Sequence, residues 1–115
     1  MTVEIWHNPR CSKSRETLKL LEENNIAANV FLYLQQQPNA QLIAEVLGKL
    51  NLMPRDLLRK SEDAYKAQNL KDKSLSDQYL IDAMVTEPKL IQRPIVINGK
   101  QARLGRPPEQ VLEIL

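Results

Sequence analysis

Cysteine and histidine are almost missing from this chain of 115 residues, which contains one of each, Cys11 and His7. A lone cysteine excludes an internal disulfide framework. One cysteine and one histidine are also too few for a structural zinc site, which takes four such ligands, so we expect no metal centre.

Long hydrophobic runs, clusters of one charge sign and an N-terminal signal peptide are missing as well. No apolar run approaches the roughly 18 residues that a membrane-spanning helix requires. The net charge is only +2, and the lysines and arginines are spread along the chain, which argues against nucleic-acid binding. We therefore expect a cytoplasmic protein that binds neither membranes nor nucleic acid.

The composition that remains is that of an ordinary globular protein, with 43% hydrophobic and 26% charged residues. The length suits one modest hydrophobic core. No repeat and no Gly/Ser-rich linker marks a boundary, so residues 1–115 are predicted to form a single domain.

Turn residues and hydrophobic periodicity predict an alternating α/β order. Strands are predicted at 2–6, 28–34, 94–97 and 101–104, and helices at 12–24, 40–47, from 54, 61–70, from 76 and 109–114. The first strand–helix–strand unit favours a parallel pair with a right-handed crossover. Asn98-Gly99 is a strong hairpin signal between the last two strands.

These elements predict a thioredoxin-like α/β fold with a mixed four-stranded sheet. A helical insertion at about 39–88 would separate its β-α-β half from its β-β-α half. Asn39 and Ser76 are candidate N-caps of helices in the insertion, and Ser12 and Ser14 are candidates for the first helix. Pro88 is expected to close the insertion, and the glutamines at 35–37 to form a loop.

Cys11 lies at the predicted turn between the first strand and the first helix. At that position a thiol faces the positive end of the helix dipole, which favours the thiolate. The alternative is a small, buried and inert side chain, as most free cysteines are. Position alone leaves both interpretations open.

Four motifs in order along the chain resemble the glutaredoxin-coupled arsenate reductase family, which includes arsenate-reductase-like members. They are HNPRCSKSRETL, LLRK, LIQRPIVING and RLGRPPEQVLEIL. The resemblance implies that Cys11 is a nucleophile that attacks arsenate, and that Arg59, Arg93 and Arg106 hold the oxyanion. Arginine suits that task because its planar fork donates two parallel hydrogen bonds to an oxyanion and keeps its charge.

The resemblance further implies that His7 helps to lower the pKa of Cys11 and that a cis peptide bond precedes Pro94. His7 would act as a cation or through a hydrogen bond, or else be a packed neutral ring. Asn8 and Ser14 would hydrogen-bond the sulfur or fix the loop; plain turn and cap chemistry is the alternative.

The sequence leaves the roles of the other cations near Cys11 open. Arg10 and Lys13 add positive potential, and Arg15 would lie in the first turn of a helix, where a cation opposes the dipole, so a specific partner that the sequence does not identify is plausible. Taken singly, Arg59, Arg93 and Arg106 could each be an ordinary solvated charge. The sequence reads RCSKSR where well-characterised family members have ACGTSR, and Gly105 stands where some members have cysteine.

One cysteine cannot supply both electrons that arsenate reduction requires and end as a thiol. We therefore expect glutathione as a co-substrate and glutaredoxin as the partner that clears the mixed disulfide. No bound cofactor is expected, and the protein is expected to be a monomer. The alternatives are a thiol redox enzyme with another substrate, or a partner-binding redox regulator; the absence of a CxxC motif argues against the regulator.

Overall fold

The computed structural model describes residues 2–115, which form two compact units. The sheet unit contains the chain up to Gln36 together with Arg93–Leu115, and the helical unit contains Gln37–Gln92. The helical unit covers the stretch in which the sequence predicts an insertion. Within residues 2–115, no helix is long and apolar enough to cross a membrane.

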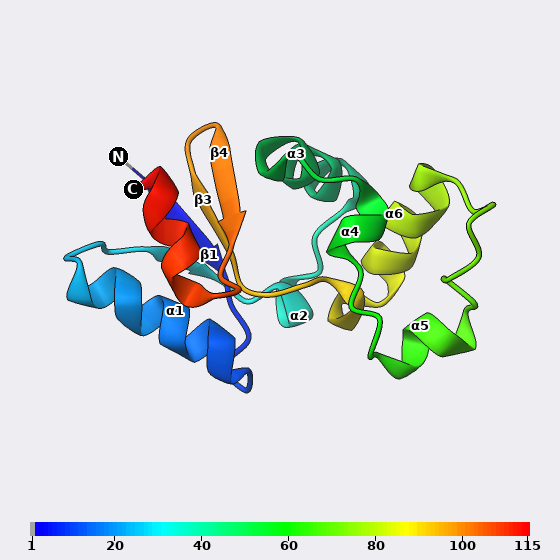
Figure 1. The fold of residues 1–115 in the computed structure, drawn as a ribbon, viewed down its shortest axis with the longest axis horizontal. Helices are drawn as coiled ribbons and strands as arrows, with labels where there is room; N and C mark the ends of the chain where they lie inside the picture. Colours follow the sequence, from blue (N-terminus) through cyan, green and yellow to red (C-terminus); the bar gives the residue numbers. More distant parts are fainter. Residues whose placement is uncertain (1) are drawn as a thin grey trace. The chain divides into compact units, whose positions relative to one another are not determined.

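The sheet unit is built on a mixed four-stranded sheet in the order β2-β1-β3-β4 (Figure 1). Its strands are β1 (Val3–Trp6), β2 (Asn29–Phe31), β3 (Ile95–Asn98) and β4 (Gln101–Leu104). β1 pairs with β2 in parallel and with β3 antiparallel, and β3 pairs with β4 antiparallel. The predicted thioredoxin-like arrangement of a β-α-β half and a β-β-α half is therefore confirmed.

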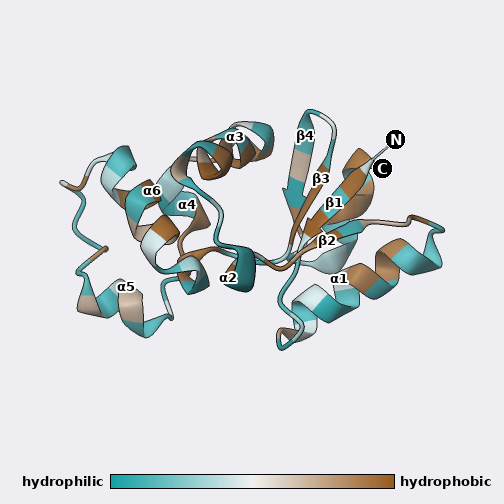
Figure 2. Ribbon diagram, turned by 180° about the vertical axis from the view of Figure 1, so that it is seen from behind, coloured by the Kyte–Doolittle hydropathy of each residue, from teal (hydrophilic) through white to brown (hydrophobic). Residues whose placement is uncertain are grey.

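Two helices cover one face of this sheet, α1 (Ser12–Glu23) and the 3₁₀ helix η2 (Pro108–Ile114). Alternate residues of β1 and β3 point into the layer between, because side chains of a strand alternate between its faces. The buried cluster there is formed by Val3, Ile5, Leu21, Val96, Val111 and Ile114. Figure 2 shows the hydrophobic character of the central strands β1 and β3.

The second strand is shorter than predicted. β2 ends at Phe31, and Tyr33–Gln36 form a one-turn helix, α2, where the sequence predicts strand and then loop. The amides of Gln35 and Gln36 donate to the Leu32 carbonyl, and the Gln36 side chain accepts from the Leu32 amide at 3.1 Å. These local hydrogen bonds compete with the strand, and the burial of Tyr33 completes the turn.

The β3–β4 hairpin is confirmed, but its turn lies one residue later than the dipeptide signal suggests. Asn98 pairs with Gln101, so Gly99 and Lys100 are the turn residues. Gly99 has φ of +62°, a left-handed conformation that glycine adopts without steric strain.

The predicted serine caps of α1 are wrong. Cys11 itself is the N-cap, with extended backbone angles and no side-chain capping bond, and Ser12 and Ser14 lie inside the first turn. The Cys11 carbonyl accepts from the Arg15 amide at 3.0 Å, which starts the helix directly after the cysteine.

The helical unit contains α3 (Ala40–Leu50), α4 (Pro54–Leu57), α5 (Asp63–Ala67), α6 (Asp77–Thr86) and the 3₁₀ helix η1 (Pro88–Leu90). The predicted caps Asn39 and Ser76 are confirmed, since their side chains accept from the amides of Leu42 and Tyr79. α5 is shorter than predicted. Pro88 begins η1 instead of simply ending the preceding helix, because proline suits a first helical position.

Long-range contacts hold the helical unit together beyond its apolar core. A bridge between Leu58 and Ile91 joins the segment after α4 to the segment after η1. The Arg55 guanidinium donates to the carbonyls of Leu70 and Asp72 at 2.8 and 2.9 Å, which ties the loop after α5 to α4. No sequence pattern announces these contacts.

Candidate active site

The loop between β1 and α1 is held by its own hydrogen bonds. The Cys11 amide donates to the Asn8 carbonyl at 3.0 Å, and the Asn8 side chain accepts from the Arg10 amide at 3.0 Å. His7 continues the strand, since its amide donates to the Phe31 carbonyl at 2.9 Å. The loop therefore places Cys11 at the carboxyl end of the parallel strands β1 and β2, where ligands bind in open α/β sheets.

Ser14 fixes this loop from the first turn of α1. Its hydroxyl is completely buried, accepts from the Asn8 amide at 3.0 Å and lies 2.6 Å from Nδ1 of His7. His7 and Asn8 are buried as well. The structure thus brings together three residues that the sequence analysis assigns to a supporting role. Ser14 fixes the loop, which is one of the two functions that the sequence analysis proposes for it.

The surroundings of the Cys11 sulfur favour the thiolate. Burial alone would raise the pKa of the Cys11 thiol, but hydrogen bonds from the Ser14 amide and from the Arg93 side chain outweigh it. The positive charge of Arg93 and the Lys13 amide act in the same direction, so the pKa lies below its ordinary value. The lowered pKa and the half-buried position favour the reactive interpretation of Cys11 over the buried, inert one.

Two of the three predicted arginines flank a single backbone contact. Arg93 precedes Pro94 and Arg106 follows Gly105, and the Gly105 amide donates to the Pro94 carbonyl at 3.0 Å. The Arg93–Pro94 peptide bond is cis, as the resemblance implies, and so is the Arg106–Pro107 bond. Arg93 reaches the Cys11 sulfur, and Arg106 is exposed.

Gly105 packs so tightly that no side chain fits. A Cβ atom at this position would lie 2.4 Å from Oγ1 of Thr17 and 2.7 Å from Cγ of Pro94. Thr17 is buried in α1, where its hydroxyl donates to the Lys13 carbonyl at 2.8 Å. The glycine found where some family members have cysteine therefore allows the Arg93 and Arg106 segments to approach α1.

The surroundings of His7 favour its neutral imidazole form. Burial lowers the pKa of His7, and the positive charge of Arg15 lowers it further. Of the interpretations left open by the sequence, this favours a hydrogen-bonding imidazole over a cation. A separate contact gives Arg15 a partner, since its guanidinium donates to the Pro9 carbonyl at 2.9 Å and ties the loop to α1.

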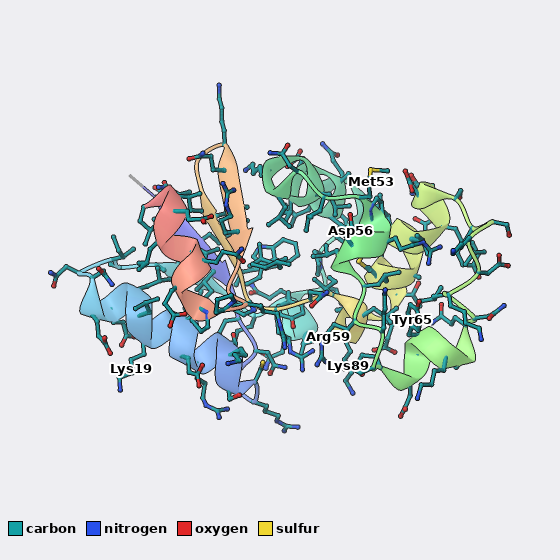
Figure 3. All side chains as sticks on the ribbon, in the orientation of Figure 1. Lys19, Met53, Asp56, Arg59, Tyr65 and Lys89 are labelled. Carbon is teal, nitrogen blue, oxygen red and sulfur yellow. The ribbon has the colours of Figure 1, made fainter. Side chains whose placement is uncertain are left out.

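Arg59 belongs to the helical unit, in the segment after α4 (Figure 3). It forms an ion pair with Glu62, and its amide donates to the Leu90 carbonyl at 2.7 Å. The geometry of the sheet unit does not test the assignment of Arg59 to the oxyanion site, which stays a prediction.

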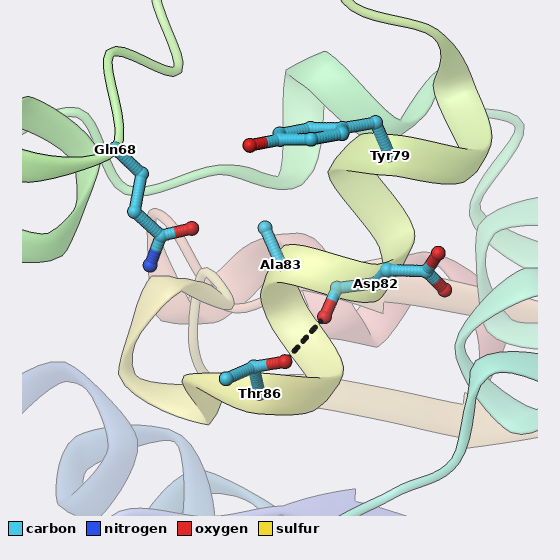
Figure 4. A pocket seen from close by; sticks show the side chains of 5 residues that line it. All are labelled: Gln68, Tyr79, Asp82, Ala83 and Thr86. Atoms are coloured by element: carbon cyan, nitrogen blue, oxygen red, sulfur yellow. Dashed lines mark hydrogen bonds between the residues drawn. The ribbon is translucent and has the colours of Figure 1, made fainter.

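The structure also contains pockets that the sequence did not signal. One lies beside the cysteine loop and is lined by loop residues together with Leu32, Leu34 and Gln35. Another lies in the helical unit, where Gln68, Tyr79 and Ala83 border it and the Thr86 hydroxyl donates to the Asp82 carbonyl at 3.0 Å (Figure 4). The helical-unit pocket contains none of the predicted site residues.

Comparison with known proteins gives consistent matches over nearly the whole chain. The model of the ArsC family matches residues 6–114. The chain is 54% identical to the uncharacterized protein YfgD of Escherichia coli K12, covering 98% of this chain and 96% of that protein. It is 47% identical to an arsenate reductase of Haemophilus influenzae, covering 100% of both.

A solved structure agrees with these matches. An arsenate reductase from Vibrio cholerae superimposes with a TM-score of 0.98 at 52% identity, covering 100% of this chain and 98% of that one.

Proposed function

Because this chain belongs to the ArsC family, we propose that it reduces arsenate to arsenite with the Cys11 thiolate, glutathione and glutaredoxin. The observation that carries the proposal is the sulfur of Cys11 at the N-cap of α1, in hydrogen-bonding contact with two backbone amides and with Arg93. That arrangement supplies both a nucleophile and cationic charge for an anionic substrate.

The first step is attack of the Cys11 thiolate on arsenic. A sulfur–arsenic bond forms and one arsenate oxygen leaves as water after protonation, so arsenic stays at oxidation state +5. Arg93 and Arg106 offset the charge of the oxyanion from the sheet unit. Arg59 enters the proposal through the family resemblance alone.

Reduction follows when a glutathione thiolate attacks the Cys11 sulfur. A disulfide forms between the two sulfurs, and the electron pair of the sulfur–arsenic bond remains on arsenic, which leaves as arsenite. Glutaredoxin then attacks the glutathione sulfur of the mixed disulfide and releases the Cys11 thiolate. Two thiols are oxidised for each arsenic reduced, so the electrons balance.

The test is a coupled assay with glutathione, glutaredoxin and glutathione reductase, in which NADPH oxidation is followed with and without arsenate. Arsenate-dependent oxidation is expected for the native chain and none for Cys11→Ser. Arg93→Lys is expected to lower kcat/KM for arsenate about tenfold, because lysine keeps the charge but loses the bidentate fork. Absence of arsenate-dependent turnover in the native chain would overturn the proposal.

The same assay separates the proposal from the alternatives. Reduction of glutathionylated peptides in the absence of any arsenate turnover would identify a thiol redox enzyme with another substrate. Binding of a protein partner without either activity would identify a regulator.

A further inference from the structure

The buried hydroxyl of Thr17 touches two parts of the chain that meet at the cysteine. It donates to the Lys13 carbonyl at 2.8 Å within α1, and its oxygen packs against Gly105, next to the segment of Arg93. We infer that Thr17 is a positioning residue, whose hydroxyl holds the first turn of α1 and the Arg93 segment in place around the Cys11 sulfur. The inference rests on the proposed function only in taking Cys11 as the reacting group.

The first contact acts through a peptide group. The Lys13 carbonyl and the Ser14 amide belong to one peptide group, and that amide donates to the Cys11 sulfur. The Thr17 hydroxyl therefore begins a chain of two hydrogen bonds that ends at the sulfur. Burial opposes the thiolate, and of the groups that lower the pKa of Cys11 against it, the Ser14 amide has the largest effect.

Hydrogen bonds in such a chain strengthen each other. A donor at a carbonyl oxygen draws electron density from the nitrogen of the same peptide group, which makes its N–H a better donor, and the gain is about 10–30% per bond. A better donor at the sulfur favours the charged form, because a hydrogen bond to the thiolate stabilises it. Removing the hydroxyl should therefore weaken the thiolate although no group in contact with the sulfur is changed.

The second contact acts through packing. A Cβ atom added to Gly105 would lie 2.4 Å from Oγ1 of Thr17, so this oxygen lies against the glycine backbone. The Gly105 amide donates to the carbonyl of Pro94, the residue directly after Arg93. Thr17 thus sets how closely the Arg93 segment approaches α1, and with it where the guanidinium meets the Cys11 sulfur.

A second threonine of the chain makes the same local bond without these two contacts. The Thr86 hydroxyl donates to the Asp82 carbonyl at 3.0 Å in α6 (Figure 4). Thr86 is exposed, so solvent can replace its hydroxyl, whereas Thr17 is fully buried. Thr86 belongs to the helical unit, and Cys11 belongs to the sheet unit. Thr86→Ala is therefore a matched control for the loss of one such bond.

The test compares Thr17→Ala with Thr17→Ser, which differ from each other only by the hydroxyl. The rate of alkylation by iodoacetamide is measured against pH in both variants, in the native chain and in Thr86→Ala. We expect the midpoint of Thr17→Ala to lie about 0.3 pH unit above that of the native chain, which is about a twofold lower thiolate fraction on the acidic side. Thr17→Ser and Thr86→Ala should keep the native midpoint.

Thr17→Val is the second variant, because it keeps the buried volume if the alanine variant does not fold. Its methyl group cannot donate to Lys13 and is larger than the oxygen that lies against Gly105. We expect its midpoint to rise at least as far as that of Thr17→Ala. Arg93 and Lys13 are retained in every variant, so a shift of the midpoint does not come from a lost charge.

Two results would overturn the inference. One is a native midpoint in folded Thr17→Ala or Thr17→Val, even with reduced stability, which would make Thr17 a packing residue alone. The other is a midpoint of Thr17→Ser raised as far as that of Thr17→Ala, which would assign the effect to the methyl group. The assay contains no arsenate, so the expected shifts in a chain without arsenate turnover would support the inference and refute the proposed function alone.

Discussion

At the scale of single residues, Cys11 depends on groups that approach it from two places in the chain. The amides of Lys13 and Ser14 come from the first turn of α1, and the guanidinium of Arg93 comes from the segment before β3. The amides are fixed once the helix forms, whereas the Arg93 contact requires the folded sheet unit. Removing Arg93 should therefore raise the pKa of Cys11 only in part, because the two amide hydrogen bonds remain.

We predict that Arg93→Gln raises the pKa of Cys11 relative to the native chain. The native thiol has a pKa below its ordinary value, so its alkylation by iodoacetamide should reach full rate at a lower pH than that of a free cysteine peptide. In Arg93→Gln the midpoint should move to higher pH. Lys100→Gln, in the exposed turn of the hairpin, serves as the control and should leave the midpoint unchanged.

His7 gives a second prediction at this scale, for stability. Its pKa in the folded chain lies below the ordinary value of 6.5, so the unfolded chain binds more protons just below that pH. The contribution of His7 to the free energy of unfolding is therefore fully present above pH 6.5 and is lost as the pH falls toward the folded pKa.

Urea unfolding between pH 5 and 8 measures this effect. His7→Gln should show a shallower decline on acidification than the native chain, because the remaining slope comes from carboxylates. An identical slope in both proteins would contradict a lowered pKa for His7.

At the scale of elements, the close approach of β4, the Pro94 turn and α1 depends on a residue with no side chain. Gly105 lies against Thr17 and Pro94, and its amide bonds the Pro94 carbonyl. Because Arg93 and Arg106 flank this contact, the spacing of the arginines depends on it.

We predict that Gly105→Ala destabilises the protein by about 1–3 kcal/mol, the usual effect of inserting a methyl group where the packing is complete. Gly48→Ala is the matched control, since an added Cβ there meets nothing within 4 Å and the residue lies inside α3. Alanine at position 48 should stabilise the chain by about 0.5–1 kcal/mol through helix propensity. Urea unfolding of the two variants, with opposite signs expected, checks both.

At the scale of the whole molecule, the proposed reduction of arsenate consumes two thiols, whereas the chain has one cysteine. The described residues contain one free cysteine, so no internal disulfide can complete a catalytic cycle. In the proposed reaction the second thiol must therefore come from outside the chain.

We predict that arsenite appears in a single-turnover experiment only after an external thiol is added. The native chain, fully reduced and in excess over arsenate, should release no arsenite alone and about one equivalent when glutathione is supplied, because each reduction oxidises two thiols. Arsenite speciation by chromatography measures the product. Arsenite formed by the chain alone, with a Cys11–Cys11 disulfide between two copies, would contradict this scheme.

The fold was largely predictable because its signals are local. Each of these signals depends on residues only a few positions apart. They are the hydrophobic alternation of β1, β3 and β4, the glycine of the hairpin turn, and the helix caps Asn39 and Ser76. The errors lie where local signals compete. Residues 32–34 have strand-forming side chains, yet glutamine hydrogen bonds and the burial of Tyr33 favour α2. Likewise, the Cys11 backbone served as the N-cap, although two serines follow it.

The sequence alone indicated which residues are candidates for the chemistry, because the motifs around Cys11, Arg59, Arg93 and Arg106 resemble those of the family and are recognised without coordinates. Only the tertiary structure decided how the residues of the sheet unit are arranged around Cys11. Arg93 contacts the Cys11 sulfur, the Ser14 hydroxyl contacts both His7 and Asn8, and Gly105 lies against α1. Each of these contacts joins residues from separate parts of the chain. Such contacts depend on packing across the fold, and a pattern read along one chain carries no distances.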